Sequence, residues 1–184
     1  MRYILVVLLI AAAQTPTPVP TPSAQAQAAA CTSPKYRELD FWLGEWDARA
    51  AKAPADRPAN SSVITKVHGG CVILETWKSP NYTGQSFNIY DRTRDKWHQT
   101  WVDSGGGLRE FWGSLKDGNM VYEGTAAAAK GQTVGDRTRM TFFNVAPGKV
   151  RQLVEHSSDG GKTWKVQYDF AYTRKAPSTS ASPQ

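Results

Sequence analysis

The fold is indicated most directly by one short stretch, Leu39-Asp40-Phe41-Trp42-Leu43-Gly44-Glu45-Trp46-Asp47. Its Gly-x-Trp step is typical of the first strand of an antiparallel barrel, and a lone arginine, Arg174, ends the last predicted strand about 130 residues later. A barrel closes by pairing its first and last strands. The Trp46 indole and the Arg174 guanidinium can then stack in a cation–π contact worth about 0.5–2 kcal/mol. We therefore expect these two residues to close the barrel.

Outward from this stretch, the chain reads as short apolar–polar runs separated by turn signals. The runs predicted as strands are 43–50, 62–67, 71–77, 85–91, 96–103, 108–115, 120–125, 137–144, 149–157 and 163–174. Residues 34–42, with Ser33 as N-cap and Pro34 at the first position, predict one short helix before them. About ten strands joined as successive hairpins favour a sandwich or an up-and-down barrel. We expect an all-β, ten-stranded antiparallel barrel.

The beginning of the chain predicts export. One arginine precedes an apolar run of about ten residues, which is half the length of ~20 that a membrane-spanning helix needs. The run fits the hydrophobic region of a signal peptide, and four prolines between positions 16 and 22 exclude a buried helix. We expect a signal peptide and Pro/Ala-rich leader over 1–30, a barrel over 31–174 and a disordered tail over 175–184. The protein would be periplasmic or secreted, with no membrane span.

The cysteine and charge patterns narrow the possible partners. Cys31 and Cys71 are an isolated pair, which tends to form a disulfide in an oxidising compartment. The net charge of +6 comes from scattered Lys and Arg rather than from the basic stripe that nucleic-acid binding needs. The three histidines, His68, His98 and His156, have no metal-ligand spacing. We expect neither nucleic acid as a partner nor a bound metal.

Three consecutive strands carry polar residues within an aromatic alternation. Residues 73, 75 and 77 share one face of their strand, as do 86, 88 and 90, and 97, 99, 101 and 103. If these faces point inward, Glu75, Asn88 and Gln99 form a polar patch ringed by tryptophan and tyrosine, which is typical of a small-ligand pocket. The predicted ligand-binding residues are Glu75, Trp77, Asn88, Tyr90, Trp97, Gln99, Trp101 and Gln152.

The opposite register is an open alternative, because it would bury the apolar residues of the same strands. These are Val72, Leu74, Phe87, Ile89, His98 and Val102. We favour the first register because it buries the tryptophans. A buried Glu75 would then need a partner, which Arg151 or Gln152 could supply. No nucleophile motif of the Gly-x-Ser-x-Gly or Ser-x-x-Lys type is present, so we assign no catalytic residue.

Residues 157–164 match the Asp-box pattern Ser-x-Asp-x-Gly-x-Thr-Trp. The Asp159 carboxylate is expected to cap its own turn, with Gly161 in the left-handed conformation and Trp164 packed beneath. Asp boxes recur in several copies in sialidase-like propellers, whereas this chain has one copy and no internal repeat. We interpret the motif as a rigid hairpin.

Taken together, the motifs resemble an uncharacterised family of exported bacterial proteins with calycin-like barrels, the group that includes lipocalins and fatty-acid-binding proteins. The resemblance is carried by residues 40–46, 70–77, 88–91, 96–103 and 150–152 and by the Asp box. It implies a barrel but no established activity. The Gly44-Glu45-Trp46 step is more distantly similar to haem-binding nitrobindins, although the later glycines of their pattern are absent. In that comparison His156 would be the candidate iron ligand.

The sequence thus favours a binding protein that holds a small, partly apolar molecule in an aromatic-lined cavity, without a required cofactor. Two alternatives stay open. One is a haem protein acting on peroxynitrite or nitric oxide, and the other is a barrel filled by its own side chains that binds a partner protein.

Overall fold

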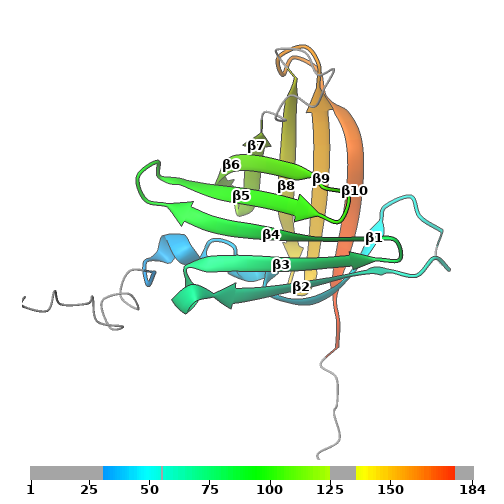
Figure 1. The fold of residues 1–184 in the computed structure, drawn as a ribbon, viewed down its shortest axis with the longest axis horizontal. Helices are drawn as coiled ribbons and strands as arrows, with labels where there is room; N and C mark the ends of the chain where they lie inside the picture. Colours follow the sequence, from blue (N-terminus) through cyan, green and yellow to red (C-terminus); the bar gives the residue numbers. More distant parts are fainter. Residues whose placement is uncertain (1–30, 55, 125–135, 177–184) are drawn as a thin grey trace, which may run out of the picture.

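The computed structural model describes residues 31–54, 56–124 and 136–176. Within these ranges, ten antiparallel strands form a closed up-and-down barrel in which β1 pairs with both β2 and β10 (Figure 1). The strands are β1 (Gly44–Ala50), β2 (Asn60–Val67), β3 (Val72–Ser79), β4 (Tyr82–Asp91), β5 (Lys96–Asp103), β6 (Leu108–Lys116), β7 (Asn119–Gly124), β8 (Arg137–Ala146), β9 (Lys149–Ser157) and β10 (Lys165–Arg174). Strands β2–β5 run across β8–β10 at a steep angle, so the two sides enclose an interior. The barrel prediction is confirmed.

The predicted strands match closely, and most differences lie at turns. Strand β4 begins at Tyr82 rather than at residue 85, because the turn contains only Pro80 and Asn81 and Ser79 pairs directly with Tyr82. The predicted helix is in fact two short 3-10 helices, η1 (Pro34–Arg37) and η2 (Asp40–Trp42), and a third, η3 (His68–Gly70), precedes β3. The expected leader over 1–30 and most of the expected tail lie outside the described residues.

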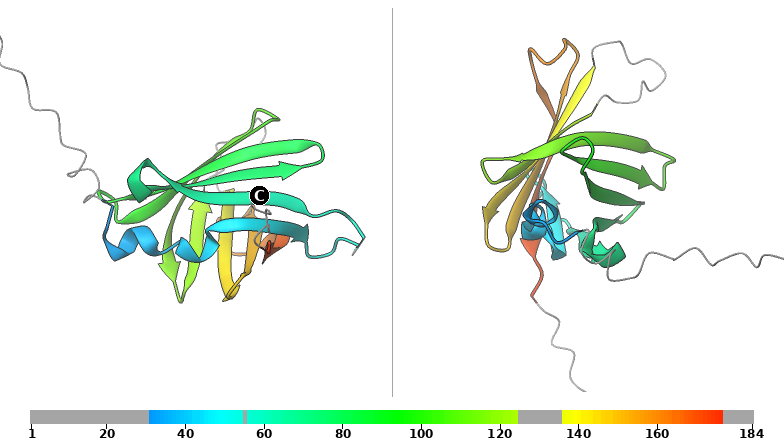
Figure 2. Two further views of the ribbon diagram at one scale, coloured as in Figure 1. Left: turned by 90° about the horizontal axis from the view of Figure 1, so that it is seen from below. Right: turned by 90° about the vertical axis from the view of Figure 1, so that its left-hand side faces the viewer.

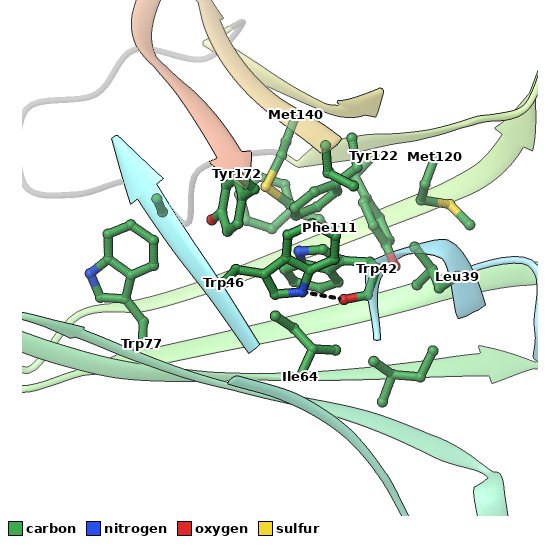
Figure 3. Close-up of a cluster of buried hydrophobic side chains, with 14 of the residues drawn as sticks. Leu39, Trp42, Trp46, Ile64, Trp77, Phe111, Met120, Tyr122, Met140 and Tyr172 are labelled. Atoms are coloured by element: carbon green, nitrogen blue, oxygen red, sulfur yellow. Dashed lines mark hydrogen bonds between the residues drawn. The ribbon is translucent and has the colours of Figure 1, made fainter. Parts of the chain in front are cut away.

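One end of the barrel is closed by these helices and by large apolar side chains. The η1 and η2 segments continue into β1 along one side of the barrel (Figure 2). Trp42 lies inside, with its ring centroid 4.4 Å from that of Phe142, and its carbonyl accepts a hydrogen bond of 2.8 Å from Trp46 Nε1 (Figure 3). The Trp97 indole donates to Glu38 Oε2 at 2.9 Å. The interior of the barrel at this end is therefore packed with side chains.

The seam between β1 and β10 contains the predicted tryptophan–arginine pair. Trp46 is in register with Arg174, and the guanidinium carbon lies 4.3 Å from the indole centroid. The guanidinium also donates to the carbonyl of Leu43. Gly44 is required here for two reasons: its φ is +124°, and a Cβ at this position would lie 2.0 Å from Arg174 Nη1. The Gly-x-Trp step thus gives the arginine access to the indole.

Two local structures predicted from the sequence are present. Cys31 and Cys71 form a disulfide that joins the segment before η1 to the start of β3. In the Asp box, Asp159 accepts hydrogen bonds from the backbone N–H groups of Lys162 and Thr163 at 2.9 Å each, and Trp164 Nε1 donates to the Gly161 carbonyl. The Asp box forms the β9–β10 hairpin, away from the interior, which fits a structural role.

Candidate functional site

The register of β3, β4 and β5 places the polar side chains inside the barrel. Glu75, Asn88 and Gln99 are 0–3% exposed, whereas Phe87 and Ile89, which the alternative register would bury, are 40% and 39% exposed. The prediction that tryptophan and polar residues face inward is confirmed. The barrel therefore encloses a buried polar group surrounded by aromatic rings.

A cavity of about 440 Å³ lies in the end of the barrel opposite η1 and η2 and opens to solvent near the β3–β4 turn. Its lining residues are Asn60, Glu75, Trp77, Ser79, Tyr82, Gln99, Trp101, Arg109, Phe111, Met140, Gln152, Tyr168, Phe170 and Tyr172. Seven of these fourteen are aromatic, so the walls are mostly apolar with a few hydrogen-bonding groups. This is the usual character of a small-molecule site.

Glu75 is the buried ionisable carboxyl of this cavity. Ser62 Oγ donates to its Oε1 at 2.8 Å and Ser86 Oγ donates to its Oε2 at 2.9 Å. Burial raises the pKa of Glu75 from 4.5 to about 7, and the two hydroxyl hydrogen bonds only partly oppose this rise. Near neutral pH the carboxyl can therefore change its charge in response to a ligand.

Neither expected partner of Glu75, Arg151 or Gln152, bonds to it. Arg151 lies on the outer face of β9 and forms an ion pair with Asp169, with Nε 2.9 Å from Oδ1. The neighbouring residue Gln152 faces the interior, where it accepts a hydrogen bond from Tyr172 OH at 2.9 Å. Serine hydroxyls from the two adjacent strands, rather than a cation, therefore satisfy the Glu75 carboxyl.

Asn88 and Gln99 form a second polar group, in which Gln99 lines the cavity and Asn88 lies beneath it. Gln99 Nε2 donates to Asn88 Oδ1 at 2.8 Å, and Tyr122 OH donates to the same oxygen at 3.1 Å. Asn88 Nδ2 donates to Ser86 Oγ at 3.1 Å. This network connects with the hydroxyl that holds Glu75, so the floor of the cavity is a single hydrogen-bonded array.

The mouth is organised by Asp103. Its Oδ2 accepts hydrogen bonds from Tyr82 OH at 2.7 Å and Trp101 Nε1 at 2.9 Å, and its Oδ1 accepts from two backbone N–H groups, of Gly105 and Gly107. These donors, that of Tyr82 foremost, lower the pKa of Asp103 to about 2. The ionised carboxylate thereby holds two aromatic rings in place at the opening.

Two further residues shape the mouth. Arg109 is exposed there, in register with Trp101. The described residues include no carboxylate within ion-pair distance of Arg109. Gly84 leaves space for the Trp101 ring, because a Cβ at Gly84 would lie 2.3 Å from Trp101 Cζ2. The glycine thus leaves room for the indole against β4, where the indole forms a wall of the cavity.

The structure brings together five of the eight predicted ligand-binding residues around the cavity: Glu75, Trp77, Gln99, Trp101 and Gln152. The other three lie elsewhere. Asn88 lies beneath the floor, and Tyr90 and Trp97 pack together toward the closed end, with centroids 6.2 Å apart. The sequence did indicate the correct face of these strands, but the face alone could not reveal where the interior is filled and where it is open.

Sequence reasoning missed the wall that β10 contributes. Tyr168, Phe170 and Tyr172 alternate with small or polar residues, a period-two pattern that could have identified them. Arg109 and Phe111 share a face of β6 in the same way. Met140 of β8 was also missed, since β8 carries buried residues on both faces and gives no clean alternation.

The histidines lie outside the cavity lining. His98 stacks on Trp112 with ring centroids 4.1 Å apart, and His156 lies in β9 with Nε2 3.9 Å from Asp136 Oδ1. His156, the ligand suggested by the nitrobindin similarity, is therefore not positioned to bind haem in this cavity. Among residues 31–54, 56–124 and 136–176, no three His, Cys, Asp or Glu side chains cluster so as to hold a metal ion.

Comparisons with known proteins add no family assignment. No protein-family model matches the chain, and no curated protein matches it in sequence. The closed ten-stranded barrel is nevertheless consistent with the calycin-like fold that the sequence motifs suggested. No helix in the described part of the chain has the length and apolar character needed to span a bilayer.

Proposed function

We propose that this protein binds a small, partly apolar molecule inside the barrel, in the cavity bordered by Glu75, Gln99 and Gln152. The observation that carries the proposal is the cavity itself: about 440 Å³ of space remains between aromatic walls in a barrel whose other end is tightly filled. A barrel acting only as a scaffold has no need for such a space, because interiors of small barrels are normally filled by side chains.

The arrangement of the lining supports binding over a purely structural role. Burying a polar group is costly unless the group is hydrogen-bonded. The buried polar side chains of this barrel border a space open to solvent, where a ligand can bond to them. The apolar walls provide affinity through burial of the ligand, while Glu75, Gln99 and Gln152 provide orientation. No histidine lines this cavity, so the haem alternative receives no support from the residues present.

Export is part of the proposal. The Cys31–Cys71 disulfide is typical of a protein that folds in an oxidising compartment, which agrees with the signal peptide expected over residues 1–30. The binding domain would then comprise residues 31–174 and act in the periplasm or outside the cell.

A fluorescence titration with the neutral apolar probe N-phenyl-1-naphthylamine tests the proposal. We expect saturable enhancement of its emission with one site per chain. Ser79→Trp adds bulk to the inward face of β3 and should weaken binding of the probe at least fivefold. Thr83→Trp adds the same bulk on the exposed side of the β3–β4 hairpin and should leave binding unchanged. Absence of saturable binding, or equal binding by both variants, would reject the cavity as the site.

A further inference from the structure

The charge inside the cavity identifies the chemistry of its occupant. Glu75 lines the cavity, is 3% exposed and has serine hydroxyls as its hydrogen-bond partners. Within residues 31–54, 56–124 and 136–176, no Lys, Arg or His lies within ion-pair distance of this carboxyl. Isolated carboxylates are expensive to bury, so a cation that enters the cavity would compensate a charge that the protein leaves uncompensated.

The neighbouring groups favour a hydrogen-bond donor over an acceptor. Each Glu75 oxygen accepts one hydrogen bond from serine and keeps a further lone pair. Gln99 donates one of its two amide hydrogens to Asn88, and its carbonyl oxygen remains available as an acceptor. The oxygens of Glu75 and Gln99 thus offer acceptors to a ligand carrying several N–H groups.

The walls suit a cation as well. Trp77, Trp101, Tyr168, Phe170 and Tyr172 line the cavity around Glu75. Aromatic faces attract ammonium groups by cation–π interactions, most strongly where water is excluded. The same rings would bury the apolar body of the ligand.

Resting on the proposed function, we propose that the ligand is an organic amine: its protonated nitrogen binds the carboxylate of Glu75 and its apolar body lies between the aromatic walls. The ammonium donates to Glu75 and to the Gln99 carbonyl, and the body extends toward the mouth. Arg109 stands at the mouth, exposed and screened by solvent, where it can face any acidic group at the far end of the ligand.

A fatty-acid-like anion fits this cavity less well. Its carboxylate could not approach Glu75 without like-charge repulsion. It would have to bind with the apolar tail inward and the head at Arg109, which would leave the polar floor facing hydrocarbon. The distribution of charge therefore separates an amine from an acid of the same shape.

Three probes with one naphthyl body test the inference by calorimetry at pH 8: 2-(1-naphthyl)ethylamine, 2-(1-naphthyl)ethanol and 1-naphthaleneacetate. We expect the amine to bind at least tenfold more tightly than the alcohol, and the acetate to bind most weakly. Glu75→Gln should weaken binding of the amine at least tenfold and change the affinity for the alcohol less than threefold. Glu45→Gln, on the exposed face of β1, is the matched control and should change neither.

The pH dependence provides a second readout. A carboxyl with a pKa of about 7 is mostly protonated at pH 6, so the amine should bind about tenfold more weakly at pH 6 than at pH 8. The other ionisable groups around Glu75 keep one state over this range. Tyr168 and Tyr172 have pKa values raised by burial, to about 12 for Tyr168, and Asp103 has a pKa lowered to about 2 by its hydrogen bonds.

The outcomes separate this inference from the proposed function. If the alcohol or N-phenyl-1-naphthylamine binds while the amine gains no preference, or if the acetate binds most tightly, the amine inference is wrong and the cavity is still a binding site. If none of the four probes binds, both are wrong. A preference for the amine that disappears in Glu75→Gln supports both.

Discussion

Replacement of Glu75 by glutamine should make the protein more stable at alkaline pH, because the folded barrel resists ionisation of this carboxyl. Its pKa is about 7 in the folded state, against 4.5 for an ordinary glutamate side chain. Between these pH values the folded state holds a proton that the unfolded chain has released. The free energy of unfolding of the native protein therefore falls as pH rises through this window.

The size of the effect follows from the same two values. A pKa raised from 4.5 to about 7 lowers the free energy of unfolding of the native protein by on the order of 3 kcal/mol. This loss is fully present above pH 7 and absent below pH 4.5. Glutamine has nearly the same shape and can keep hydrogen bonds to Ser62 and Ser86, but it has no charge to bury.

Urea denaturation followed by tryptophan fluorescence, at pH 4.5, 6 and 8, measures this effect. The stability of Glu75→Gln relative to the native protein should rise by on the order of 3 kcal/mol from the lowest to the highest pH. Glu45→Gln, an exposed position on β1, should show no such trend. A difference in the free energy of unfolding between variant and native protein that stays constant with pH would refute a buried carboxyl at position 75. A difference that shifts against the variant from pH 4.5 to pH 8 would refute it as well.

Three further predictions concern other parts of the structure. Replacing Cys31 and Cys71 together by alanine removes a cross-link between positions 40 residues apart and should lower the free energy of unfolding in urea by about 4 kcal/mol. Gly44→Ala should cost about 2 kcal/mol or more in the native background but less in Arg174→Ala, since the clash is with the guanidinium; equal costs in a double-mutant cycle would contradict this. Gly84→Ala should weaken N-phenyl-1-naphthylamine binding at least fivefold in the fluorescence titration, because the added Cβ displaces the indole that walls the cavity.

Much of the fold was predictable because it depends on local patterns. The alternation along β3–β5 and the spacing of the turns identified the strands and their inward faces, and β5 and β9 match in both bounds. The pairing of Trp46 with Arg174 followed from the ends of a closed barrel. These features depend on periodicity and chain order, which a single sequence contains.

The cavity was less predictable because it depends on what fills the interior. Trp97 and Trp101 share one strand face, yet Trp97 packs against the closed end while Trp101 walls the cavity. The pattern is the same for both, and only the position of η1 and η2 separates them. The faces of β9 were undecided for a similar reason, since Val150, Leu153 and Val154 are apolar on both faces. The serine partners of Glu75 required the register of three strands.

The central claim is that an organic cation can occupy the cavity against Glu75. A crystal structure of the protein with 2-(1-naphthyl)ethylamine, grown at pH 8, tests it most directly. We expect the amine nitrogen to lie about 3 Å from a Glu75 carboxylate oxygen, with the naphthyl ring between Trp77 and Trp101. An empty cavity, or a probe bound on the outer face of the barrel, would contradict it.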